Sequence, residues 1–181
     1  MDNFDYSSND RFSYTKIKIK VAGLNIFLNK KILIYGLGRS GLSAFKFLKK
    51  NKNDIFLYDD YPSKIENSDI KKNLISYQKI TKFKFDQIIL SPGIDINNCK
   101  LSKFLKKNLS KIYSDLDVFY SFYKNDCITI TGTNGKSTTC QLMYEVLRNQ
   151  KFEVKLVGNI GNPILSVKNV KKKTIFIIEA S

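Results

Sequence analysis

The segment from Thr131 to Thr138 most constrains what this chain can fold into, because it reads Thr-Gly-Thr-Asn-Gly-Lys-Ser-Thr between two regular elements. Apolar residues 127–130 predict a strand before it, and residues 139–148 predict a helix after it. Glycines let several backbone N–H groups face one anion, and a helix N-terminus adds a dipole that favours negative charge. Lys136 would neutralise β- and γ-phosphates, and the Ser137 hydroxyl can ligate Mg²⁺. The segment therefore predicts phosphoryl chemistry on a nucleoside triphosphate.

The spacing of the glycines departs from the general Walker pattern. The position five before Gly135 is Ile130, and the upstream glycine is Gly132, three residues away. A glycine-rich turn with an exposed lysine is the simpler alternative for such a segment. The strand before it and the helix after it favour the phosphate loop.

A second glycine loop, Gly36-Leu-Gly-Arg-Ser-Gly41, fits the G-x-G-x-x-G pattern. It follows the apolar residues 31–35 and precedes a helical stripe formed by Leu42, Ala44, Phe45 and Leu48. Asp59 stands where a dinucleotide-binding fold keeps its ribose-binding acid. A nicotinamide dehydrogenase and a protein for another nucleoside diphosphate are both compatible with this loop, because both hold a diphosphate at a helix N-terminus.

Alternating strands and helices predict an α/β protein with parallel sheets. We expect a loose N-terminal extension (1–29) with a short strand at 17–21, a Rossmann-like domain (30–124) and the start of a P-loop α/β central domain (125–181). Further elements are expected as strands at 54–58, 86–90, 153–157 and 174–178, and as helices at 99–108 and 115–123.

Three groups of acidic residues follow or precede expected elements. Glu179 comes after a buried run, so it would emerge at the carboxyl edge of a parallel sheet, where ligands of such folds bind; a solvated charge at a strand end is the alternative. Asp59 and Asp60 are also common turn formers. Asp115 and Asp117 are expected to cap and flank a helix rather than to do chemistry.

The composition excludes several functions. The chain has no histidine, so a His-based triad, metal ligand or general base within these residues is excluded. The formal charge of +15 invites a nucleic-acid function, but the lysines are scattered and no recognition motif accompanies them. Three widely spaced cysteines indicate reduced thiols, and the absence of a long apolar run indicates a cytoplasmic protein that does not span a membrane.

The form Gly-Thr-Asn-Gly-Lys-Ser-Thr resembles the Mur ligases and their folate-ligase relatives, which form amides at the expense of ATP. Other segments come in the order expected of the branch that adds D-glutamate to UDP-N-acetylmuramoyl-L-alanine. They are Gly-Leu-Gly-Arg-Ser-Gly-Leu-Ser from Gly36, Ser-Pro-Gly-Ile from Ser91, Ser-Asp-Leu-Asp-Val-Phe from Ser114 and Gly-Asn-Ile-Gly-Asn-Pro from Gly158. The resemblance, over residues 30–181, favours a ligase, since a dehydrogenase needs no second, triphosphate-type loop.

The resemblance implies roles for individual residues. The first loop, with Gly36, Gly38, Arg39, Ser40 and Gly41, would hold the UDP diphosphate. Asp59 and Asp60 would lie near the uridine, Ser91, Pro92 and Gly93 along the nucleotide, and Asn159 near the muramoyl-peptide end. ATP would contact Gly132, Thr133, Asn134, Gly135, Lys136, Ser137 and Thr138. Lys136 and Glu179 would be catalytic, and Ser137 and Glu179 would bind Mg²⁺.

The resemblance also implies a reaction between two small molecules. The L-alanyl carboxylate would take the γ-phosphoryl group of ATP, and the amine of D-glutamate would attack the acyl phosphate. The chain ends inside a family motif, so it resembles a truncated monomer without the C-terminal domain and without activity by itself. Residues 174–178 are expected to form an unfinished sheet edge.

Overall fold

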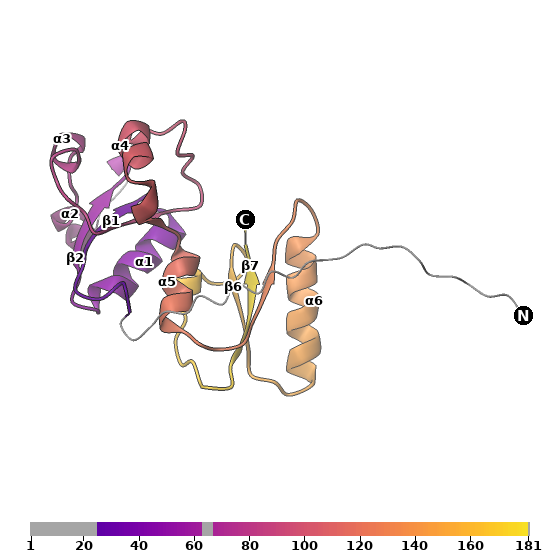
Figure 1. Cartoon of the computed structure of the whole chain (residues 1–181). Coiled ribbons are helices and arrows are strands. Elements are labelled where there is room, and N and C mark those ends of the chain that lie inside the picture. Colours follow the sequence, from indigo (N-terminus) through magenta and orange to yellow (C-terminus); the bar gives the residue numbers. More distant parts are fainter. Residues whose placement is uncertain (1–24, 63–66, 181) are drawn as a thin grey trace, which may run out of the picture.

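The computed structural model describes residues 25–62 and 67–180, which form two parallel sheets (Figure 1). The strand expected at 17–21 and most of the extension therefore lie outside the described residues. Among the described residues, no helix is both long enough and apolar enough to cross a bilayer.

The first sheet has the strand order β2-β1-β3-β4. Its strands are β1 (Lys31–Tyr35), β2 (Asp54–Tyr58), β3 (Gln87–Leu90) and β4 (Ile112–Tyr113). Neighbouring strands all pair in parallel, as the βαβ pattern predicted. β1 lies inside the sheet and is buried from its second residue onward, so both of its faces are covered.

Helices cover both faces of the first sheet. α1 (Arg39–Lys49) buries Ala44, Phe45 and Leu48 in a cluster with Ile32 and Ile34 of β1. The other face packs under α3 (Tyr77–Ile80) and α4 (Ser102–Lys107), and α2 (Ser68–Lys72) lies beside β2. α4 is shorter than expected, because residues 99–101 form a turn ahead of it.

The second sheet has the order β5-β7-β6, with β5 (Cys127–Ile130), β6 (Val154–Gly158) and β7 (Ile175–Glu179) all parallel. The expected sheet edge at 174–178 was wrong, since β7 lies between the other two strands. A central strand is covered on both faces, which explains why residues 175–178 form a continuous apolar run. Phe176, Ile177 and Ile178 are fully buried. Glu179 is the last residue of β7 rather than the residue after it.

Two helices flank the second sheet. α6 (Lys136–Asn149) lies on one side, and α5 (Asp115–Phe122) lies between the two sheets (Figure 1). The Phe119 ring of α5 meets the Phe176 ring of β7 edge to face at 4.9 Å and stacks on Tyr123 at 4.8 Å. One hydrophobic cluster thus runs from α1 through α5 to β7, and it fixes the second sheet against the first.

Candidate functional site

The loop after β5 is open and shaped by two glycines. Gly132 has a φ of 143° and Gly135 one of 75°, both in the region that favours glycine. A Cβ at either position would meet nothing within 4 Å, so space for a ligand lies directly against the backbone. Gly135 is the N-cap of α6 and no side chain caps it, which leaves the first N–H groups of the helix available to an anion.

Lys136 and Ser137 occupy the first turn of α6. The Lys136 ammonium group folds back and donates to the carbonyl oxygens of Gly132 and Thr133. The Ser137 hydroxyl donates to Glu179 Oε2 at 3.0 Å, across 42 positions of sequence. The helix N-terminus and the end of β7 are thereby joined at one point, and the expected metal residues are brought together.

Glu179 is only 6% exposed. It pairs in register with Ile130 at the end of β5 and with Gly158 at the end of β6, so all three strands end at the same place. Gly158 has a φ of 108°, and a Cβ there would overlap the Glu179 carbonyl oxygen. Only glycine lets β6 end this close to β7, and the Asn159 N–H then donates to that carbonyl at 3.1 Å.

The oxygen donors of Ser137 and Glu179 suit Mg²⁺, which prefers hard oxygen ligands and usually keeps several waters. The described residues contain no cluster of three or more His, Cys, Asp or Glu side chains that could hold a metal. A magnesium ion held by Ser137 and Glu179 would fill other positions with phosphate and water. Such a site fits a metal that arrives with its nucleotide better than a permanently bound one.

The first glycine loop is packed tightly onto its helix. A Cβ on Gly41 would overlap the Gly36 carbonyl oxygen, and one on Gly36 would come within 2.8 Å of Ser91 Cβ. The Ser91 hydroxyl donates to the same Gly36 carbonyl at 2.6 Å. Gly38 is the N-cap of α1 and lacks a side-chain cap, so this helix also presents an open N-terminus. Pro92 and Gly93 lie exposed beyond Ser91.

Asp59 and Asp60 both support the loops at the end of β2. Asp59 accepts hydrogen bonds from the N–H groups of Leu37, at 2.7 Å, and Tyr61, at 2.9 Å. Asp60 accepts the Tyr35 hydroxyl at 3.0 Å. Burial, followed by the neighbouring Asp60 charge, raises the pKa of Tyr58 to about 12. Asp59 thus ties the end of β2 to the first glycine loop, which is a structural role for the turn-forming residue.

Arg39 crosses to the second sheet, where its guanidinium donates to the Gly161 carbonyl at 2.9 Å. The same region holds a short 3₁₀ turn, η3 (Ile164–Ser166), which packs against α1 and α5. In this structure Arg39 therefore bridges the two units, beside the helix end where a diphosphate contact was expected.

Between the sheets lies a cleft of about 330 Å³. The first unit contributes Ser40 of the first glycine loop and Asp115 of α5, and the second unit contributes Asn159 and Glu179. Ser40 of the first glycine loop and Glu179, the expected metal ligand, consequently face one cavity. Lys136 is not among the residues lining this cleft.

The sequence analysis missed the role of Asp115. Asp117 forms the capping box with Ser114, as capping requires, whereas Asp115 turns into the cleft and is 8% exposed. Burial raises the pKa of Asp115, and a hydrogen bond with the Ser40 side chain opposes that rise. The sequence analysis gave both acids the same role because an acidic residue at either position suits the first turn of a helix.

The fold and the loops define a parallel α/β protein with two glycine loops, each of which ends at an uncapped helix N-terminus. Residues 30–112 match the family model for the Mur ligase MurD-like N-terminal domain, and residues 130–181 match that for the Mur ligase middle domain. The chain belongs to the Mur ligase family. This membership decides between the ligase and dehydrogenase interpretations of the first glycine loop in favour of the ligase.

Curated relatives from three bacteria support the same assignment, and all three carry the name UDP-N-acetylmuramoylalanine–D-glutamate ligase. The protein from Rickettsia prowazekii is 38% identical over 152 residues, which cover 80% of this chain and 33% of the relative. The proteins from Wolbachia pipientis and Aquifex aeolicus are 32% and 34% identical over 87% and 83% of this chain. They are covered to 32% and 34% of their own length, so the chain spans about a third of these relatives.

Proposed function

We propose that this chain provides the UDP-binding and ATP-binding parts of an enzyme that joins D-glutamate to UDP-N-acetylmuramoyl-L-alanine. The observation that carries the proposal is the cleft that Ser40 and Glu179 share. A substrate whose diphosphate lies on the N-terminus of α1 would direct its other end toward the N-terminus of α6. Its L-alanyl carboxylate would then meet the γ-phosphate of ATP between the two sheets.

The cradles have separate tasks in this proposal. The first loop binds the diphosphate of the sugar nucleotide through the open N–H groups at Arg39, Ser40 and Gly41, with the uridine toward Asp59 and Asp60 and the nucleotide along Ser91, Pro92 and Gly93. The second loop, from Gly132 to Thr138, binds ATP. Asn159 holds the muramoyl-peptide end beside Glu179.

The weak electrophilicity of the L-alanyl carboxylate determines the order of the proposed steps. A carboxylate is a poor electrophile, so its oxygen attacks the γ-phosphorus of ATP, ADP leaves and an acyl phosphate forms. The amine of D-glutamate then attacks the acyl carbon, and phosphate leaves as the amide forms. Lys136 would exchange its contacts with the Gly132 and Thr133 carbonyls for phosphate oxygens, and Ser137 and Glu179 would hold Mg²⁺. The metal supplies charge neutralisation to the transferring phosphoryl group.

We propose that the protein acts as a monomer in the cytoplasm, where both nucleotides are available, and that it has no nucleic-acid partner. Binding of the two nucleotides is proposed for the chain itself. Because the relatives are about three times as long as the matched part, the complete reaction is proposed for a protein of their length.

Calorimetry on the 181-residue chain tests the two cradles separately. We expect UDP and Mg-ATP each to bind with one site, and NAD⁺ to bind far more weakly than UDP. Lys136→Ala removes a charged donor, which should cost about 1.5–3 kcal/mol, or roughly 10- to 150-fold in ATP affinity, and should leave UDP affinity unchanged. The proposal would be refuted if neither nucleotide binds to the chain, or if Lys136→Ala weakens UDP affinity as much as Mg-ATP affinity.

A further inference from the structure

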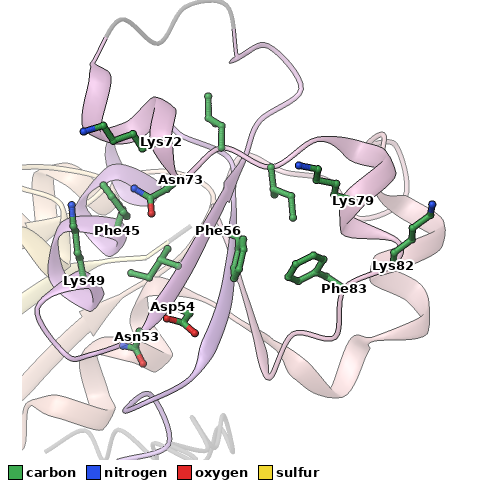
Figure 2. Close-up of a pocket in the computed structure, with 13 residues that line it drawn as sticks. Phe45, Lys49, Asn53, Asp54, Phe56, Lys72, Asn73, Lys79, Lys82 and Phe83 are labelled. Carbon is green, nitrogen blue, oxygen red and sulfur yellow. The ribbon is translucent and has the colours of Figure 1, made fainter.

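A pocket of about 580 Å³ lies on the outer edge of the first sheet, away from both glycine loops. Figure 2 shows that it surrounds β2, the edge strand of that sheet. Its floor is apolar and includes Phe45, Ile55 and Phe56. None of its lining residues lines the cleft between the sheets. The proposed ligase function leaves this pocket unexplained.

The pocket opens where the edge of β2 is uncovered. The carboxyl half of that edge is paired, because the Leu57 N–H donates to the Asn73 carbonyl at 2.8 Å and the Leu57 carbonyl accepts the Ile75 N–H at 2.9 Å. Alternate residues of a strand present their backbone groups to the same side, so Ile55 faces the same way as Leu57. Within residues 25–62 and 67–180, no segment pairs with Ile55 there. An N–H and a carbonyl are thus presented to a further strand.

Side chains arrange the pocket in two halves, one on each face of β2. Ile55 belongs to the hydrophobic cluster of α1 together with Phe45, whereas Phe56 packs on the opposite face, 5.3 Å from the Phe83 ring. In Figure 2, Lys49 and Lys72 lie on the Phe45 side of the strand, and Lys79 and Lys82 lie on the Phe83 side. An added strand sends its side chains alternately to these two faces, and each face offers an apolar floor with two lysines.

The charge of the pocket selects its occupant. All four lysines are exposed, and the one ion pair between the described residues joins Lys171 to Glu153, outside the pocket. Asp54 is the sole acidic residue among those that line it. The Lys49 ammonium group lies 5.4 Å from the centre of the Phe45 ring, which keeps that cation over the apolar floor. A ligand with carboxylates on both faces therefore matches this edge.

We propose that the free edge of β2 binds an acidic, extended segment of a partner protein, which adds to the first sheet as a short strand. The Ile55 backbone supplies hydrogen bonds and register, Phe45 and Phe56 supply apolar contact, and the four lysines select acidic side chains. The available edge is short, so the complex is transient. It leaves the N-termini of α1 and α6 uncovered, and nucleotide binding continues while the segment is bound.

The test uses the peptide Ac-Glu-Glu-Val-Ile-Glu-Glu-NH₂ with the 181-residue chain at low salt. We expect saturable binding, slower amide hydrogen exchange at Ile55 and at least tenfold weaker binding to the Lys79→Glu/Lys82→Glu variant. The matched control is Lys106→Glu/Lys107→Glu, which reverses two exposed lysines of α4 and should leave the peptide affinity within twofold.

Two further ligands distinguish strand pairing at the β2 edge from binding by charge alone, and neither requires a change in the protein. The same peptide N-methylated at Val and Ile keeps its charge but loses two donors, and it should bind at least tenfold more weakly. Equal binding of the two peptides, unchanged exchange at Ile55, or equal weakening in the control variant would overturn the proposal. Citrate that displaces the peptide and slows Ile55 exchange equally well would assign the pocket to small anions and would also overturn it.

Discussion

The packing of Phe119 between the sheets makes a quantitative prediction. Its side chain is fully buried and contacts the rings of Phe176 and Tyr123. Truncation of a buried phenylalanine to alanine costs about 3–5 kcal/mol, from lost transfer free energy and the cavity left behind. With a urea slope of about 2 kcal/mol/M, Phe119→Ala should lower the unfolding midpoint by about 1.5–2.5 M. Because this contact holds the sheets together, UDP and Mg-ATP should also bind more weakly.

The assay is urea unfolding followed by far-ultraviolet circular dichroism. The matched control is Phe152→Ala, because Phe152 is 51% exposed and its truncation should cost less than about 1 kcal/mol. A loss at Phe119 no larger than that of the control would refute the reasoning. It would mean that the sheets do not depend on this contact for their arrangement.

Other changes separate the two cradles. Gly41→Ala places a methyl group against the Gly36 carbonyl, so UDP affinity should fall at least tenfold with Mg-ATP affinity unchanged; an unaltered UDP isotherm would contradict the loop geometry. Glu179→Gln should weaken Mn²⁺ binding in the presence of ATP, measured by electron paramagnetic resonance, and should spare UDP. Burial raises the pKa of Asp115 in the folded chain. The stability that Asp115 contributes is therefore present below its pKa in the unfolded chain, near 3.8, and is lost as the pH rises through its pKa in the folded chain. The free energy of unfolding of the wild type relative to Asp115→Asn should therefore fall from pH 4 to pH 7, and a flat difference would show that Asp115 does not titrate this way.

Local sequence signals predicted much of the fold. The strands at β1, β2 and β5 begin and end where the apolar runs predicted, because each run is short and bounded by glycine or polar residues. The start of α6 was less clear. Residues 136–138 belong to the helix although they are polar and carry no apolar stripe, because the Gly135 N-cap begins it there.

Strand order was harder to predict than strand position. The sequence places β7 last among the elements of the second sheet, and its central place depends on long-range pairing with both β5 and β6. The two-residue strand β4 and the short helices α2 and α3 give too weak a periodicity to be recognised. Elements defined by tertiary contacts were therefore missed, while elements defined by their own residues were found.

The candidate site shows the same division. The phosphate loop was predicted from its own eight residues, and the two residues predicted to bind the metal, Ser137 and Glu179, are joined by a hydrogen bond. The position of Asp115 in the cleft and the Arg39 bond to Gly161 depend on how the two sheets pack. The individual roles assigned to these residues stay predictions until ligand binding is measured.

The central claim is that the first glycine loop faces the same cleft as Glu179, the residue that is bonded to Ser137 at the end of the second loop. Phosphorus NMR of the 181-residue chain with UDP, ATP and Mn²⁺ in place of Mg²⁺ tests it most directly. If the claim is right, Mn²⁺ held with ATP at Ser137 and Glu179 broadens the diphosphate signals of bound UDP, and Glu179→Gln reduces the broadening. Sharp UDP signals while both nucleotides and Mn²⁺ are bound would contradict it.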